Sequence, residues 1–439
     1  MKFSEVKAVR IPKGSAARIR SKELIRWEKF PVLARYVSLG DSIAAGHTIN
    51  SDWDKSYGER SQYGVNGNEE TVIVPGCYTD LIRKDLLEKY GDGRIVVNSF
   101  ARSGDTVADL MEKLNHDRVR NAIAKANYVT VCIGANDVLE PAMSHLEEYL
   151  MSSSLAGAEA VIAENMATLN NDSAATSFMS LFDKLTSINH RAKYAFTTVY
   201  NPYKYLHLYP GHNGFFEPLL DTIPEMRYDV DEIIEDMFGW DDLGYWDALA
   251  RKWVSIELTA NISSLIKDGL LGAPAVQTLF LRVNALGGVS EGYVTRLNDI
   301  LRNKINAYKA TNANFALAET KAMFDQYPDK TDATDDVDYS DLVNVEYTKT
   351  YNVAKMDWGM LWEGSNADTF WRELAWKHLH FSNAFPSTNV WDYVWFDLDG
   401  FASDLVEQIV YKVILPDTDP HPEEYGHIVL KGAFMDAIG

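Results

Sequence analysis

The sequence predicts an α/β protein whose parallel central sheet is covered by helices on both faces. Short apolar runs alternate with longer segments in which apolar residues recur at helical spacing. The apolar runs show little polar alternation, as is typical of strands that are buried on both faces. Hydrophobic residues make up 46% of the 439 residues and charged residues 24%, which is typical of a globular protein.

Each expected element follows from its local pattern. The helix expected at 77–90 places Leu81, Ile82 and Leu86 on one face, and residues 107–114 and 294–305 show the same spacing. The expected strands lie at 36–39, 95–97, 128–133, 194–200 and 315–317.

Three parts of the chain fall outside this alternation. Residues 1–30 are interpreted as an N-terminal extension, and residues 31–439 as one domain with two large insertions. The insertions are expected at about 203–285 and 335–415, packed over or beside the sheet. The second contains six of the eleven tryptophans, which are interpreted as core residues more readily than as a sugar-stacking surface.

Charge and composition narrow the classes of partner. The 63 acidic and 42 basic residues give a formal net charge of -21, which disfavours nucleic acids and anionic membrane surfaces. The N-terminus shows no apolar signal segment, and no apolar run is long enough to span a bilayer. We therefore expect a soluble protein that is either cytoplasmic or released by a route other than a signal peptide. The two cysteines, Cys77 and Cys132, are too few for a thiolate zinc site and are expected to be buried free thiols.

The ends of the expected strands carry the residues suited to chemistry. In parallel sheets, ligands bind beyond the carboxyl ends of the strands. Ser42 follows the first strand, Gly104 the second and Asn136 the third, and His421 lies near the C-terminus. A nucleophilic serine needs a base, a role that His421 can fill, and acyl transfer needs oxyanion donors, for which Gly104 N–H and the Asn136 amide are suited.

These residues stand in four motifs that resemble the conserved blocks of the SGNH (GDSL-type) serine hydrolases. The blocks are 36–46, 103–104, 134–137 and 419–422, in the family's order. The resemblance implies a flavodoxin-like three-layer α/β/α sandwich and esterase activity without metal or organic cofactor. It implies that Ser42 is the nucleophile and an oxyanion donor, that Gly104 and Asn136 are the other donors, and that His421 is the base.

The partner of His421 departs from the family's pattern. The family places an aspartate three residues before the histidine, where this chain has Thr418. Asp419 and Asp417 flank that position, and Asp419 is preferred. A Ser42–His421 dyad without a third residue is the remaining alternative. His427 is interpreted as structural.

A competing motif is present at residues 288–292, Gly-Val-Ser-Glu-Gly. It matches the Gly-x-Ser-x-Gly elbow of α/β-hydrolases, which would make Ser290 the nucleophile. The residues before it form a poor strand, so we expect a loop in which Ser290 caps a helix that begins near Tyr293.

The predicted function is hydrolysis of carboxylic esters, with O-acetyl groups of a polysaccharide as the preferred substrate. A lipase or phospholipase-type acylhydrolase is one alternative. Another is a virion protein with an accessory or vestigial esterase site, because residues 6–27 resemble the opening segment of some bacteriophage tail-associated proteins. Expected partners are an ester substrate and, for the virion alternative, other virion proteins; a homo-oligomer is also open.

Overall fold

A computed structural model describes most of the chain from residue 31 onward. The segment 1–30 lies outside the described residues, as do Asp417 and Asp419, so the virion-attachment hypothesis and the choice between the two aspartates stay predictions. The described residues are 31–47, 49, 73–152, 154–206, 217–224, 263–328, 337–343, 358–362, 365–381, 394–414 and 420–439.

A five-stranded parallel sheet forms the centre of the molecule. Its strand order is β2-β1-β3-β4-β5, which is the flavodoxin-like order. All four neighbouring pairs run parallel, as the apolar runs predicted. The strands are β1 (Ala34–Gly40), β2 (Ile95–Ser99), β3 (Tyr128–Cys132), β4 (Lys193–Thr197) and β5 (Phe315–Ala318).

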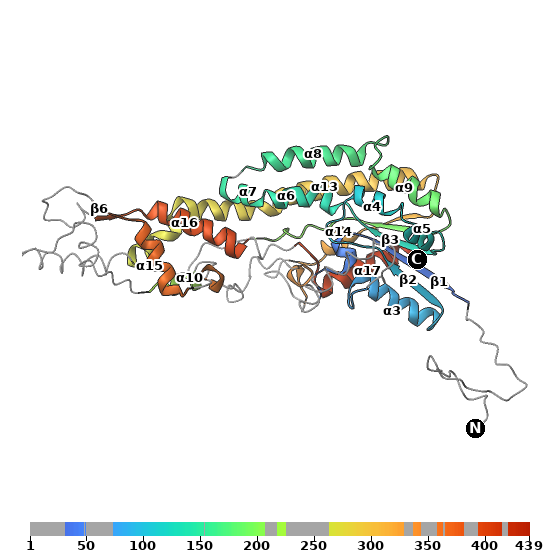
Figure 1. Cartoon of the computed structure of the whole chain (residues 1–439), viewed down its shortest axis with the longest axis horizontal. Helices are drawn as coiled ribbons and strands as arrows, with labels where there is room; N and C mark the ends of the chain where they lie inside the picture. The colour runs from blue at the N-terminus through green and yellow to red at the C-terminus, as the bar shows by residue number, and fades with distance from the viewer. Residues whose placement is uncertain are drawn as a thin grey trace, which may run out of the picture.

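Helices cover both faces of this sheet (Figure 1), which confirms the three-layer α/β/α prediction. Successive strand residues point to opposite faces. Tyr36 of β1 packs with one core cluster, together with side chains of α3 (Tyr78–Tyr90) and α17 (Glu424–Ile438). Val37 packs with the other. The helices on that second face are α4 (Val107–Lys113), α5 (Asp117–Ile123), α6 (Ala135–Ser144), α8 (Ala156–Asn170), α9 (Phe178–Ile188) and part of α13 (Pro274–Lys309).

Helix α13 is longer than the sequence indicated and joins two parts of the molecule. Its C-terminal half, with Leu297 and Leu301, covers the sheet. Its N-terminal half, with Phe280 and Val283, packs against Phe401 and other side chains beside the sheet. In Figure 1 the helices packed on this half, α10 (Glu217–Asp221), α15 (Ala367–Lys377) and α16 (Leu398–Ile409), extend away from the strands along α13. The described part of the tryptophan-rich segment thus lies beside the sheet.

Trp371, in the tryptophan-rich segment, tests the interpretation of its tryptophans as core residues. It is fully buried, and its indole N–H donates to Thr222 Oγ1 at 2.9 Å, so it acts as core, whereas Trp376 on the same helix is exposed. The remaining elements are α1 (Ser42–Ala45), α7 (Leu146–Ser152), α14 (Thr320–Phe324), the short helical turns at Leu270–Gly272, Tyr339–Asp341, Trp358–Trp362 and Val410–Ile414, and the antiparallel pair β6 (Leu379–Phe381) and β7 (Val394–Phe396).

Two expectations about composition can be compared with the described residues. Cys77 and Cys132 are both buried free thiols. Among the described helices, none combines the length and apolar character that crossing a membrane requires.

Candidate active site

The candidate site lies at the carboxyl edge of the sheet, between β1 and β3. After β1 the chain moves outward to β2, and it then returns to the other side of β1 to form β3. This is the topological switch point at which open α/β sheets bind ligands. Ser42 follows β1 and Asn136 follows β3, so the fold brings these two residues to neighbouring strand ends.

Ser42 is the first residue of the short helix α1. Asp41 caps this helix, and its Oδ1 accepts a hydrogen bond from Ile43 N–H at 3.1 Å. The backbone N–H of Asp41 donates to Cys132 O at 3.0 Å, which ties the turn to the end of β3. Since the first N–H groups of a helix have no partner within it, the Ser42 N–H is suited to donate to an oxyanion.

Gly104 and Asn136 lie on two segments that contact each other. Gly104 sits in the exposed loop after β2 with φ 83°. The Asn136 Nδ2 donates to Asp105 O at 3.0 Å, so the amide is held against this loop. An amide nitrogen carries two hydrogens, which leaves the second for a ligand. Below the loop, the buried Asp105 carboxylate pairs with the buried Lys113 ammonium.

His421 reaches the site from the segment before α17. Tyr200 OH, beyond the end of β4, donates to Pro420 O at 2.7 Å. Pro422 forms an isolated bridge with Val343, and Glu423 N–H donates to Leu342 O at 3.0 Å. The segment that carries His421 is therefore held from both sides.

Ser42, Gly104, Asn136 and His421 line one cavity of about 320 Å³. They come from four separate parts of the chain, and the sequence had selected all four. Part of the remaining wall is apolar, including Ile43, Leu139, Met143 and Val199. The cavity thus combines a hydroxyl, an imidazole and candidate oxyanion donors with a surface that can bind an apolar acyl group.

Residues 36–235 match the model of the GDSL-like Lipase/Acylhydrolase family. The match covers less than half of the chain and agrees with the family resemblance of its motifs. No curated protein matches the chain.

Several solved structures resemble the chain at low sequence identity. The acetylxylan esterase Axe2 from Geobacillus stearothermophilus is 14% identical, with 94% of this chain and 96% of that chain covered and a TM-score of 0.35. An extracellular lipase from Streptomyces rimosus is 13% identical, with 65% and 81% covered and a TM-score of 0.31. A lipase from a goat rumen metagenome is 18% identical, with 39% of this chain and 66% of that chain covered and a TM-score of 0.26.

The carboxyl group of Asp41 is the most unusual ionisable group beside Ser42. It is buried, and its Oδ2 has no hydrogen-bond partner. Burial raises the pKa of Asp41 from 3.8 to about 7, against the opposing effects of the Ile43 N–H and of His421. The negative charge of Asp105 raises this pKa further. Asp41 is therefore largely protonated below neutral pH.

Two other polar residues near the site have structural roles. The buried Asp137 accepts a hydrogen bond from Val107 N–H at 3.1 Å, which fixes the start of α4. His427 is fully buried, and its Nδ1 accepts from Tyr78 N–H at 3.2 Å. Burial lowers the pKa of His427 to about 3, so this ring is neutral at ordinary pH, in line with the structural interpretation.

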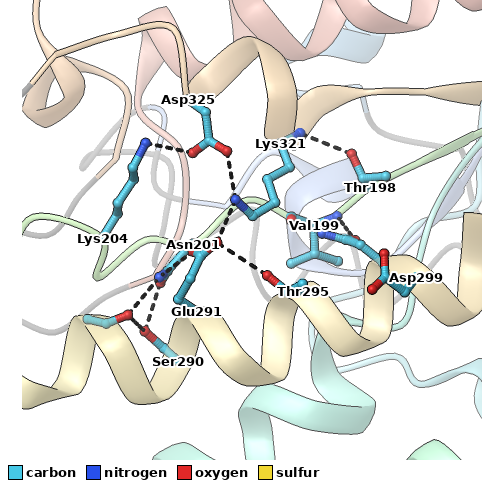
Figure 2. Close-up of polar contacts among 12 residues, drawn as sticks. Thr198, Val199, Asn201, Lys204, Ser290, Glu291, Thr295, Asp299, Lys321 and Asp325 are labelled. Carbon is cyan, nitrogen blue, oxygen red and sulfur yellow. Dashed lines mark hydrogen bonds and ion pairs between the residues drawn. The ribbon is translucent and has the colours of Figure 1, made fainter.

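The competing serine motif is wrong as a nucleophile elbow, and so is the loop that we expected there. Ser290 lies inside the continuous helix α13, where its Oγ donates to Leu286 O at 2.8 Å. An elbow requires a sharp turn from a strand into a helix, with the serine exposed. Ser290 is instead buried and also donates to Asn201 Oδ1 at 2.9 Å (Figure 2).

The neighbours of Ser290 form a polar network that joins α13 to the ends of β4 and β5. Figure 2 shows Lys321 between Glu291 and Asp325, with Lys204 on the far side of Asp325. These pairs balance in charge, and every charged side chain in the network has an opposite partner. The network accounts for the polar residues around the motif without a catalytic role.

Three polar side chains of the cavity wall were not predicted from the sequence. His47, Glu140 and Tyr200 line it beside Ser42 and His421. His47 lies five positions after Ser42, directly after the first motif, and that proximity was the signal available for it. Glu140 lies on the same helix as Asn136, one turn later. Among the described residues, no group of three or more His, Cys, Asp or Glu side chains is arranged to hold a metal ion.

Proposed function

We propose that the chain is a serine esterase that hydrolyses carboxylic esters through an acyl-enzyme on Ser42. The observation that carries this proposal is that Ser42, Gly104, Asn136 and His421 line one cavity at the β1–β3 switch point. The match of residues 36–235 to the GDSL-like Lipase/Acylhydrolase model supports the same reaction class.

The proposed reaction has two halves. The Ser42 hydroxyl attacks the ester carbonyl while His421 takes its proton, and the resulting oxyanion accepts hydrogen bonds from Ser42 N–H, Gly104 N–H and Asn136 Nδ2. The tetrahedral intermediate collapses, and His421 gives its proton to the departing alcohol. Water then attacks the acyl group with His421 as the base, which releases the acid and restores Ser42.

As substrate we propose an O-acetyl ester of a polysaccharide. Support comes from the formal charge of -21, because an acidic protein is repelled by anionic lipid surfaces but not by neutral glycans. The cavity of about 320 Å³ beside Ser42 has room for a group as small as acetyl. The reaction would release acetate and leave the glycan chain itself intact.

A lipid-type acylhydrolase is the second candidate, and the apolar wall of the cavity favours it. Leu139, Met143 and Val199 would contact an acyl chain longer than acetyl. The two candidates differ in chain-length preference. Rates on p-nitrophenyl acetate, butyrate, octanoate and laurate separate them, followed by acetate release from acetylated xylan. Faster cleavage of octanoate than of acetate would overturn the acetyl proposal.

The test of the reaction class is the variant Ser42→Ala, with Ser290→Ala as the matched control. Ser42→Ala is expected to lose nearly all hydrolysis of p-nitrophenyl acetate while keeping the melting temperature of the wild type. Ser290→Ala is expected to keep its activity. Undiminished hydrolysis in Ser42→Ala would refute the proposal.

A virion location is a further proposal that rests on residues 6–27 alone. It allows either an active or a vestigial site, and covalent labelling distinguishes them. An active site is expected to react with a fluorophosphonate probe at Ser42, and Ser42→Ala is the control. Folded wild-type protein that stays unlabelled would favour the vestigial alternative.

A further inference from the structure

His47 is placed beside the candidate site by the turn that ends α1. The backbone N–H of His47 donates to Ser42 O at 3.0 Å. Gly46 adopts φ 80°, and a Cβ added there would lie 2.8 Å from Cys77 Cβ and 2.9 Å from Val74 Cβ. The chain therefore turns tightly against residues 74–77 before His47, which lines the cavity.

The imidazole of His47 contacts two parts of the candidate catalytic apparatus. Its ring centroid lies 4.5 Å from that of His421, with an interplanar angle of 43°. Its Nδ1 lies 3.4 Å from Ser103 Oγ, at the long end of the hydrogen-bonding range. Ser103 immediately precedes Gly104, so a single side chain touches both the base and the loop that carries an oxyanion donor.

Two side chains, those of Asn136 and His47, hold the loop that carries Gly104. Asn136 holds the Gly104 loop from one side through Asp105 O, and His47 holds it from the other through Ser103. The His421 ring lies against His47 on the cavity side. A shift of the His47 ring would therefore displace the base and the oxyanion loop together.

We propose that His47 is a positioning residue of this site, one that sets the plane of the His421 ring and the location of the Gly104 N–H. This inference rests on the proposed esterase function. Acyl transfer depends on angstrom-scale alignment of nucleophile, base and oxyanion donors, so a loss of positioning slows the chemical step more than it weakens substrate binding.

Three variants separate the two contacts of His47. His47→Ala removes both, His47→Phe keeps a flat ring against His421, and Ser103→Ala removes only the hydrogen bond to the loop. His190→Ala is the matched control, because His190 is exposed in the loop before β4, at the opposite edge of the sheet.

The measurement is steady-state hydrolysis of p-nitrophenyl acetate together with the melting temperature. In His47→Ala, kcat is expected to fall about 10- to 100-fold with KM changed less than about threefold. His47→Phe and Ser103→Ala are expected to lose about three- to tenfold each, with melting temperatures near that of the wild type. The control is expected to match the wild type in both quantities.

The outcomes separate this inference from the proposed function. Wild-type kcat in His47→Ala, with Ser42→Ala inactive, overturns the positioning role and leaves the esterase intact. Wild-type protein without esterase activity refutes the function instead. In that case the ring-proton chemical shifts of His421 decide the inference: a change in His47→Ala supports it, and unchanged shifts overturn it.

Discussion

Replacing Asp41 by asparagine should stabilise the protein above neutral pH. The carboxyl is fully buried with one unpartnered oxygen, and its pKa is raised from 3.8 to about 7. A folded-state pKa above the unfolded value means that the folded protein binds the proton more tightly, so stability falls as pH rises from about 4 to about 7. The difference of about three pKa units corresponds to about 4 kcal/mol of lost stability above pH 7. Asparagine avoids this cost and keeps the oxygen that caps Ile43 N–H.

The assay is urea unfolding of wild type and Asp41→Asn at pH 5.5 and pH 8.5. About half of the cost is already present at pH 5.5, so the advantage of the variant should grow by about 2 kcal/mol between the two values. Neighbouring groups such as His427 titrate in both proteins and largely cancel in the difference. A stability difference that is the same at both pH values would refute a raised pKa at Asp41.

Two further predictions concern neighbouring residues. Asn136→Ala removes an oxyanion donor and should lower kcat for p-nitrophenyl acetate about 100- to 1000-fold. It should also cost about 1 kcal/mol of stability, because the hydrogen bond to Asp105 O is lost. If kcat stays within threefold of the wild type while Ser42→Ala is inactive, Asn136 is not a donor. Ser290→Ala should keep full activity and lose about 1 kcal/mol of stability in urea unfolding, because the Ser290 hydroxyl bonds within α13 and to Asn201. A folded but inactive variant would instead favour Ser290 as the nucleophile.

The sheet could be predicted from the sequence because its strands are buried on both faces. Tyr128–Cys132 is an uninterrupted apolar run except for Thr130, and Thr130 is buried with its hydroxyl bonded to Tyr36 OH. In a chain that alternates strands and helices, such runs are typical of strands in a parallel sheet covered on both faces. The candidate site followed from the same pattern, because parallel strands bring the residues after them to one edge.

The course of α13 could not be predicted, because three glycines within the six residues 287–292 are more typical of a loop than of a helix interior. Gly287 lies inside the helix, and a Cβ there would lie 2.6 Å from Tyr203 O. The glycine thus serves the close approach of another segment, a tertiary requirement that local sequence does not reveal. The contact of His47 with His421 could not be predicted for the same reason, because it joins residues far apart in the sequence.

The segment that follows β4 connects the site to the part of the molecule beside the sheet. Tyr200 OH donates to Pro420 O, directly before His421. The next residue, Asn201, donates from Nδ2 to Gly287 O and Glu291 Oε2 of α13, at 3.1 Å and 3.0 Å. The bond to Gly287 O is buried and the bond to the Glu291 carboxylate is charge-assisted, so breaking either one costs free energy. Tyr200 therefore holds the segment that carries His421, and the adjacent Asn201 holds α13. Because the two residues are neighbours in the chain, the position of His421 depends on the packing of α13.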